Sequence, residues 1–219
     1  MSLIAITVIF SLIASTLQVS WPRGTYTLVK PRSGCPRGWL EGWRYQDNED
    51  KHNTNFITPG HHFAGGFDKN MRFQYCTKNQ HQFSNRRYWP RGNYCILKHG
   101  HSCPRYFRQG SVYWDDEDNS NKNAHGGTLP SGSYDRNTRI DYCCRKDGSY
   151  RSKMSLPTSK PFYLLRFRAH CQRVSGMHVR EETVKSDDED TRNKNLVRGW
   201  YPLGAGGRNH VLQYCYYWR

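Results

Sequence analysis

The sequence predicts an all-β protein with few or short helices, folded as a single compact domain of three pseudo-repeats held together by disulfides. One acidic pattern occurs three times, three segments of alternating apolar residues end in Tyr-Cys, and eight cysteines are present among 219 residues. Gly, Pro, Asn and Ser interrupt the chain too often for long helices. The best helical candidate is residues 178–190, where Glu181, Glu182 and Lys185 have suitable spacing.

The acidic pattern reads D-x-E-D-x-x-N-x-N and begins at Asp47, Asp115 and Asp187. Repetition at fixed offsets indicates three copies of one structural unit, which we place at approximately residues 21–88, 89–155 and 156–219. The first two copies open with a Trp-Pro-Arg-Gly turn before an aromatic and aliphatic strand, whereas the third opens more loosely around Leu156 and Pro161. The closing strands are predicted at Phe73–Cys76, Ile140–Cys143 and Leu212–Cys215.

The cysteines predict a disulfide framework, because their number is even and no C-x-x-C pair of metal-site type occurs. Equivalent cysteines of the three repeats should pair equivalently, and the remaining two should form a fourth bridge. The adjacent Cys143 and Cys144 leave open a rival pairing in which they exchange partners. The predicted bridges are Cys35–Cys76, Cys103–Cys143, Cys171–Cys215 and Cys95–Cys144.

Residues 1–20 are predicted to be a secretory signal peptide, followed by the domain at 21–219. The run from Leu3 to Ala14 is almost wholly apolar and about half as long as a membrane span. The alternative is a buried N-terminal strand or an anchor helix. No other segment is apolar enough to cross a membrane, so we expect a secreted, extracellular protein without a transmembrane segment.

The charge of the chain favours polyanionic partners. Lys and Arg total 33 against 18 acidic residues, a net charge of +15, and more than half of the acids lie in the three acidic motifs. The rest of the surface should therefore be strongly basic. Nucleic acid could attract such a charge, but it is not expected as a partner of an exported protein.

The acidic motifs have two interpretations. Their Asp and Asn side chains could cap turns and pair with Arg, which we favour, or their oxygens could hold calcium. No cofactor is required by the sequence, and calcium is the one candidate ligand. No catalytic signature is present, so we expect no enzyme activity. The candidate calcium ligands are Asp47, Glu49, Asp50, Asn53, Asp115, Glu117, Asp118, Asn121, Asp187, Glu189, Asp190 and Asn193.

Several stretches of the chain resemble the ApeC domain, the C-terminal domain of apextrin and apextrin-like proteins. The resemblance covers nearly all of the chain after the predicted signal peptide, without the perforin-like domain that often precedes it. It implies a secreted innate-immune protein for pattern recognition. The stretches that carry it include Trp21–Tyr26, Ser33–Pro36, Tyr45–Asp50, Trp89–Ile96, Trp114–Asp118, Leu129–Asp135, Tyr142–Arg145, Cys171–Val174 and Tyr214–Tyr217.

The function expected from this resemblance is binding of a bacterial cell-wall polymer, with peptidoglycan first among the candidates. Another anionic surface glycan would suit the same basic surface. The alternative function is adhesion in the extracellular matrix through an anionic glycosaminoglycan or another protein. Exposed aromatic rings could stack on sugars, and Arg could bind carboxylate or phosphate. The candidate contact residues are Trp39, Trp43, Trp200, Arg86 and Arg87.

Overall fold

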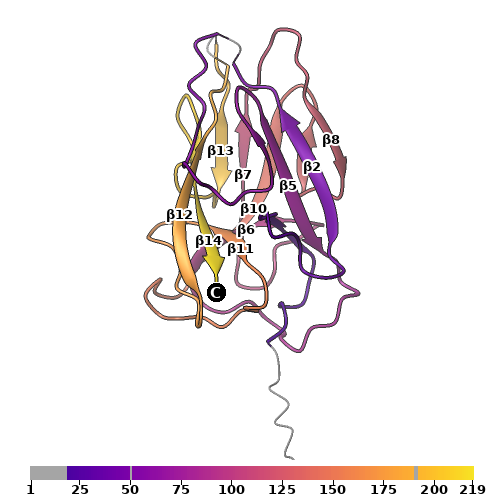
Figure 1. Cartoon of the computed structure of the whole chain (residues 1–219), viewed down its shortest axis with the longest axis vertical. Helices are drawn as coiled ribbons and strands as arrows, with labels where there is room; N and C mark the ends of the chain where they lie inside the picture. The colour runs from indigo at the N-terminus through magenta and orange to yellow at the C-terminus, as the bar shows by residue number, and fades with distance from the viewer. Residues whose placement is uncertain (1–18, 50, 190–191) are drawn as a thin grey trace, which may run out of the picture.

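The computed structural model describes residues 19–49, 51–189 and 192–219 (Figure 1). Within these residues the chain forms fourteen β-strands and no helix, and every strand pairing is antiparallel. The predicted all-β fold is therefore confirmed. Of the predicted signal peptide, all but Val19 and Ser20 lie outside the described residues. No helix long and apolar enough to span a membrane occurs in the described part of the chain.

The strands form three equivalent groups, one for each predicted repeat. In each group the closing strand lies between the opening strand and the strand that leads into the acidic motif. Short strands β4 (Gly65–Phe67) and β9 (Gly132–Tyr134) add to two of the closing strands. The groups are β1 (Tyr26–Val29), β5 (Met71–Lys78) and β2 (Leu40–Gln46); β6 (Asn93–Lys98), β10 (Thr138–Lys146) and β7 (Arg108–Trp114); and β11 (Phe162–Leu165), β14 (Val211–Trp218) and β12 (His178–Lys185).

A fourth strand in each group comes from a different repeat. Strand β8 (Ala124–Gly127) of the second repeat pairs with β2 of the first. Strand β13 (Leu196–Gly199) of the third repeat pairs with β7 of the second, and β3 (Phe56–Ile57) of the first pairs with β12 of the third. We call each group with its exchanged strand a sheet and number it by its repeat, although all fourteen strands are linked in one hydrogen-bonded sheet. Each repeat therefore completes the sheet of the preceding one, and the exchange closes in a cycle.

The predicted helix at residues 178–190 is wrong, because His178–Lys185 is strand β12. It pairs with β14 along its whole length. Glu182 and Val184 are buried while Glu181 is exposed, which is the two-residue period of a strand. The β-branched residues Val179, Thr183 and Val184 suit that pairing, and it outweighs the weak helical spacing of the charges.

The four disulfides join the cysteines that the repeats predict to be equivalent, and none links two repeats. Cys35–Cys76, Cys103–Cys143 and Cys171–Cys215 occupy the same place in the three groups. The fourth, Cys95–Cys144, links the opening and closing strands of the second repeat. Each bridge closes a loop of 40 to 49 residues. The rival exchange of Cys143 and Cys144 does not occur in the structure.

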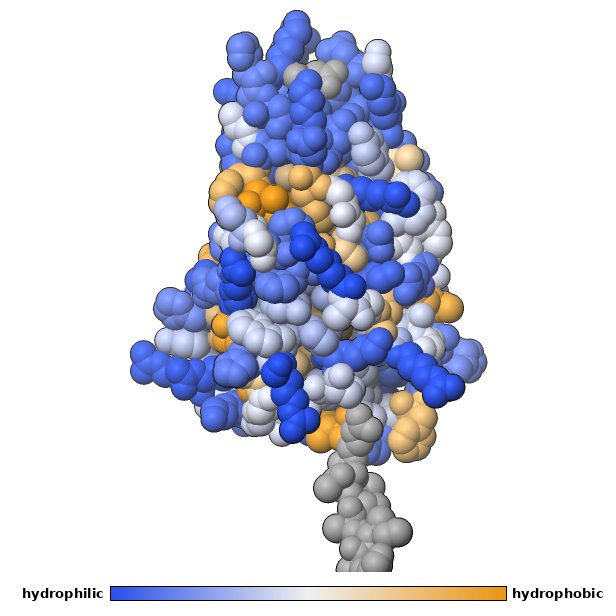
Figure 2. Space-filling model, viewed as in Figure 1, coloured by the Kyte–Doolittle hydropathy of each residue, from blue (hydrophilic) through white to orange (hydrophobic). Residues whose placement is uncertain are grey.

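Two aromatic cores fill the interior, one toward each end of the molecule. The first contains Phe63, Tyr75 and Trp114, and the second contains Trp21, Trp39 and Trp89. The Trp-Pro openings border the second core. In the first repeat the Tyr26 hydroxyl donates to the Pro22 carbonyl at 3.0 Å, and the equivalent Tyr in the second repeat makes the same bond at 2.6 Å. On the face shown in Figure 2, the upper end of the molecule is almost wholly hydrophilic, an apolar patch lies directly below it, and further apolar patches lie toward the lower end.

Candidate functional site

Each acidic motif carries the chain from its own sheet to the neighbouring one. The first begins at Asp47, directly after β2, and ends at Asn55, directly before the exchanged strand β3. The motifs lie together at the upper end of the molecule in Figure 1. Their recurrence therefore has a structural cause, because every repeat needs the same crossover.

The motifs bind one another in a ring. In each case the side-chain oxygen of the last Asn accepts the main-chain N–H of the first Asp in the preceding repeat. The carboxylate of that Asp in turn accepts a main-chain N–H just before the same Asn. The Asp-to-Asn bonds are Asp47 to Asn123 at 2.7 Å, Asp115 to Asn195 at 2.8 Å and Asp187 to Asn55 at 2.6 Å. The reciprocal bonds are Lys122 to Asp47 at 2.8 Å, Lys194 to Asp115 at 2.8 Å and Thr54 to Asp187 at 2.6 Å.

These contacts add a further role to the one predicted for the motif. The sequence favoured turn capping and pairing with Arg, and turn capping is present: the Asn53 amide donates to the Glu49 carbonyl at 2.7 Å. An ion pair also joins Asp118 to Arg136 at 2.8 Å. The first Asp of each motif, however, accepts main-chain N–H groups of another repeat. The dominant role is therefore to join repeats.

The calcium hypothesis remains a prediction. Among the described residues, no three His, Cys, Asp or Glu side chains are grouped as a metal ion would need. Asp50 and Asp190 lie outside the described residues. The oxygens of Asp47, Asp115 and Asp187 already accept main-chain N–H groups. The arrangement does not fit a calcium site unless those bonds are displaced.

The second position of the motif is fully buried in all three copies, as Asn48, Asp116 and Asp188. Burial raises the pKa of Asp116 to about 6, although Thr138 and Asn123 donate to its carboxylate at 2.6 and 2.7 Å. Burial also raises the pKa of Asp188 well above its ordinary value, and the nearby Asp116 raises it further. These two carboxyls are thus stabilised in the protonated form on folding.

The raised pKa of Asp116 predicts stability that increases as the pH falls. An unfolded Asp has a pKa near 3.9, so between about pH 6 and pH 4 the folded state binds a proton that the unfolded state does not. That stability is fully present below pH 4 and is lost as the pH rises through 6. Asp116→Asn, which copies Asn48, should remove a gain of about 2 kcal/mol. Urea unfolding of both proteins at pH 7, 5.5 and 4 measures the difference. Parallel pH profiles would contradict the prediction.

A groove of about 650 Å³ is lined by the N-terminal end of the described chain and by residues just before β2 and at the end of β5. These segments lie in the lower part of the molecule in Figure 1, away from the acidic motifs. We call this groove the basal groove. Its walls combine aromatic rings with cationic side chains. Trp21 and Trp39 meet edge to face at 5.3 Å, and Phe83 is 83% exposed. The aromatic and cationic residues of the groove that are suited to contact a ligand are Trp21, Arg37, Trp39, Lys78, Phe83 and Lys160.

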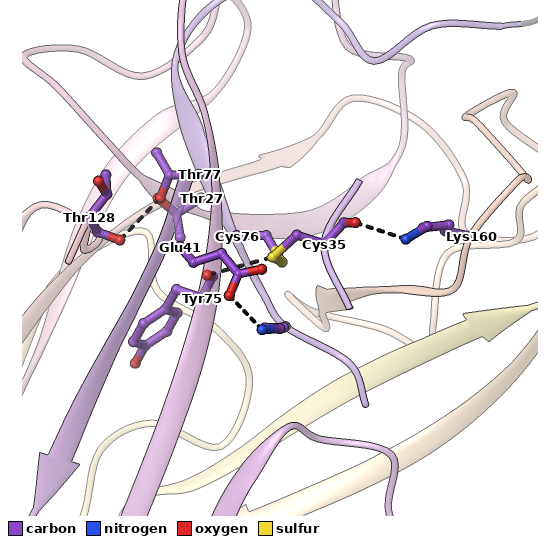
Figure 3. Close-up of a disulfide and its surroundings, with 9 residues drawn as sticks. Thr27, Cys35, Glu41, Tyr75, Cys76, Thr77, Thr128 and Lys160 are labelled. Carbon is purple, nitrogen blue, oxygen red and sulfur yellow. Dashed lines mark hydrogen bonds and ion pairs between the residues drawn. A yellow bond between two sulfur atoms is a disulfide. The ribbon is translucent and has the colours of Figure 1, made fainter. Parts of the chain in front are cut away.

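The basal groove lies between the first and third repeats. Lys160 of the third repeat donates from Nζ to the carbonyl oxygen of Cys35 at 3.1 Å, beside the Cys35–Cys76 disulfide (Figure 3). The disulfide fixes the segment that carries Arg37 and Trp39 to strand β5, which ends at Lys78. The walls are therefore held by covalent and hydrogen-bonded contacts.

Lys78 is a buried cation with no acidic partner among the residues that the structure describes. It is 1% exposed, and its ammonium donates to the carbonyls of Gly24, Asn79 and Gln82 at 3.3 to 3.5 Å. Burial lowers its pKa. No carboxylate of the described residues lies within 4.0 Å of its ammonium. A buried ammonium of this kind favours the binding of an anion, because folding has already removed the ammonium from water.

The second repeat provides an internal comparison. Arg145 is equivalent to Lys78, since each is the cross-strand partner of the Tyr in its opening strand. Arg145 is neutralised by Asp147, whose carboxylate accepts from Nε at 2.7 Å. The residue equivalent to Asp147 in the first repeat is Gln80. The first repeat therefore keeps the buried cation and lacks the acid.

The five predicted contact residues do not form one site. Trp39 lines the basal groove. Trp43 lies on β2, and the guanidinium carbon of Arg72 lies 4.5 Å from the centre of its indole ring. Trp200 stacks on Phe167 with ring centres 5.0 Å apart. The side chain of Arg87 lies over Tyr88 at 5.1 Å, and Arg86 is half-buried beside the segment that carries Phe83.

Sequence reasoning missed Lys78, Trp21 and Phe83. A lysine at a strand end is usually solvated, so its type alone carries no signal. The signal that could have found it is the comparison of Lys78-Asn79-Gln80 with Arg145-Lys146-Asp147.

Comparison with known proteins gives one match. A family model described as ApeC, the C-terminal domain of apextrin, matches residues 21–217. The match begins at the first Trp-Pro turn and ends within β14, so it extends over all three repeats and includes the lining of the basal groove except Val19 and Ser20. Searches of curated proteins and of solved structures found no match.

Proposed function

We propose that this chain, which belongs to the ApeC family, binds a bacterial cell-wall polymer, namely peptidoglycan, through the basal groove. The observation that carries the proposal is the buried, acid-free ammonium of Lys78 beside the rings of Trp21 and Trp39. The protein acts by binding, as a secreted pattern-recognition protein of innate immunity, and catalyses no reaction. Four disulfides suit an oxidising, extracellular compartment.

The chemistry of peptidoglycan matches both kinds of wall in the groove. Its amino sugars offer apolar ring faces and acetyl groups, which pack on aromatic side chains. Its peptide stems end in carboxylates, which an ammonium or guanidinium that has no carboxylate partner of its own can bind. Lys78 would take such a carboxylate, with Arg37 at the exposed rim adding a second cation. The net charge of +15 draws an anionic polymer toward the surface.

Retention on insoluble peptidoglycan tests the proposal, with chitin as the uncharged control. We expect retention on peptidoglycan alone. Lys78→Gln keeps a donor for the surrounding carbonyls and removes the charge, so binding should weaken about tenfold. Phe83→Ala should weaken it by about threefold without loss of stability, because that ring is 83% exposed.

Two control variants match these changes outside the groove. Lys122→Gln removes an exposed lysine in the second acidic motif, and Phe56→Ala removes a ring that is 48% exposed on β3. Both should bind like the original protein. Equal retention on peptidoglycan and chitin, or on neither, would refute the proposal. Retention on heparin with steep salt dependence and no binding to bacteria would favour the matrix-adhesion alternative.

A further inference from the structure

The three sheets carry different side chains at equivalent places on their outer faces. Each of these equivalent places lies where the strand before the acidic motif pairs with the exchanged strand, that is, β2 with β8, β7 with β13 and β12 with β3. In the second sheet it forms a depression of about 410 Å³, which we call the β7–β13 depression. Its lining residues are Ser111, Tyr113, Arg139, Lys194, Leu196 and Arg198.

The strand registers explain why these residues gather. Ser111 is the cross-strand partner of Arg198, and Tyr113 is the partner of both Leu196 and Arg139. Residues two apart on a strand point to the same face, so these five side chains share one side of the sheet. Lys194, two residues before the first residue of the exchanged strand β13, adds a third cation at the edge of the depression.

In the first sheet a tryptophan side chain fills the equivalent place. Trp43 stands where the second sheet has Ser111, and its cross-strand partner is Gly126 where the second sheet has Arg198. A Cβ at Gly126 would lie 2.9 Å from Nε1 of Trp43, so the indole requires glycine there. Arg72, the equivalent of Arg139, lies over the indole at 4.5 Å.

The third sheet has the same place without the two arginines and without Lys194, and its one cation there, Lys185 in the place of Tyr113, donates from Nζ to Thr54 Oγ1 at 2.7 Å. Thr183 and Thr58 replace Ser111 and Arg198, and they hydrogen-bond each other, with the Thr183 N–H donating to Thr58 Oγ1 at 2.8 Å. Val211 stands where the second sheet has Arg139. The open, cationic version therefore belongs to the second sheet.

The charges in the β7–β13 depression are largely unneutralised. Arg139 donates to the Asp141 carboxylate, with Nη1 and Oδ1 3.2 Å apart, and Lys98 lies 3.7 Å from the same carboxylate. The ammonium of Lys194 and the guanidinium of Arg198 have no carboxylate within 4.0 Å in the described part of the chain. Two cations and the hydroxyl of Ser111 are left to face the depression.

We propose that the β7–β13 depression binds a tetrahedral oxyanion, the phosphate or sulfate ester of an anionic polymer. Guanidinium and ammonium groups on two sides, with a hydroxyl between them, suit an anion with several acceptor oxygens. The exposed side chain of Leu196 offers an apolar contact for the carbon backbone of that polymer. This site is separate from the basal groove and does not depend on the function proposed for the groove.

Nuclear magnetic resonance titration with inorganic phosphate and with sulfate tests the site. We expect saturable shifts of the amide signals of Ser111, Tyr113 and Arg198. Arg198→Gln should weaken the affinity about tenfold, whereas Arg173→Gln, which removes an exposed arginine elsewhere, should leave it unchanged.

The first sheet supplies a second variant. Ser111→Trp combined with Arg198→Gly copies Trp43 and Gly126, fills the depression and should abolish the saturable shifts. Retention on immobilised poly(glycerol phosphate) against heparin distinguishes a phosphate from a sulfate source. Lys78→Gln should bind both as the original protein does. Unchanged binding by the filled variant, equal loss in Arg173→Gln, or no saturable shift in the original protein would overturn the proposal.

Discussion

Replacing Asn123 by Ala should lower the free energy of unfolding by about 3 kcal/mol. This side chain accepts the Asp47 N–H at 2.7 Å and donates to the Asp116 carboxylate at 2.7 Å. It also donates to the carbonyls of Asp135 and Arg136 at 3.1 and 2.9 Å. Alanine leaves all four partners without this contact, and the Asp47 N–H loses the acceptor that joins the first repeat to the second.

Denaturant unfolding with the disulfides intact measures the loss. A fall of about 10 °C in the melting temperature is expected for a chain of this length. Asn119→Ala is the control, because Asn119 is exposed and uses its main-chain N–H to reach Glu117 at 2.7 Å, which alanine keeps. If Asn123→Ala were as stable as Asn119→Ala, the ring of motifs would not join the repeats.

Converting both Cys95 and Cys144 to Thr should lower the free energy of unfolding by about 4 kcal/mol and leave the fold intact. The loss follows from the 49-residue loop that this bridge closes. The fold should survive because the same cross-strand place is a threonine pair in the first repeat. There Thr27 and Thr77 hydrogen-bond each other at 2.7 Å between their Oγ1 atoms.

Peptide mapping under nonreducing conditions completes this test. The double variant should retain Cys35–Cys76, Cys103–Cys143 and Cys171–Cys215. The third repeat also supports the expectation that the fold survives without this bridge. At the place equivalent to Cys95 and Cys144 it has Tyr163 opposite Tyr216, with ring centres 5.2 Å apart. A double variant that fails to fold, or that matches the original stability, would show that the fourth bridge has another role.

Much of the fold follows from local patterns. The Tyr-Cys strand endings and the equivalent cysteines place β5, β10 and β14 and their disulfides, because a two-residue period and the equivalent positions of cysteines in repeats can be read from the sequence. Residues 178–190 were misassigned because the spacing of Glu181 and Lys185 suits either structure. Pairing with β14 makes His178–Lys185 a strand.

Less of the candidate site could be predicted. Trp39 was expected as a contact and lines the basal groove, but Trp43 and Trp200 lie elsewhere. Aromatic side chains are candidates for both core and ligand contact, so residue type alone cannot separate the two roles. Arg145 is followed two residues later by Asp147, which neutralises it, whereas Lys78 is followed by Gln80. This difference has an effect on charge because both side chains are buried.

The sequence by itself determined that this protein is built from three equivalent all-β units with a disulfide inside each, since repetition and cysteine position are properties of the chain. The tertiary structure alone decided that each unit completes the sheet of its neighbour. It also decided that the acidic motifs hold the units together and that Lys78 is buried with no carboxylate of the described chain beside it. The physical reason is that these features depend on contacts between residues 54 to 132 positions apart, which no local pattern encodes.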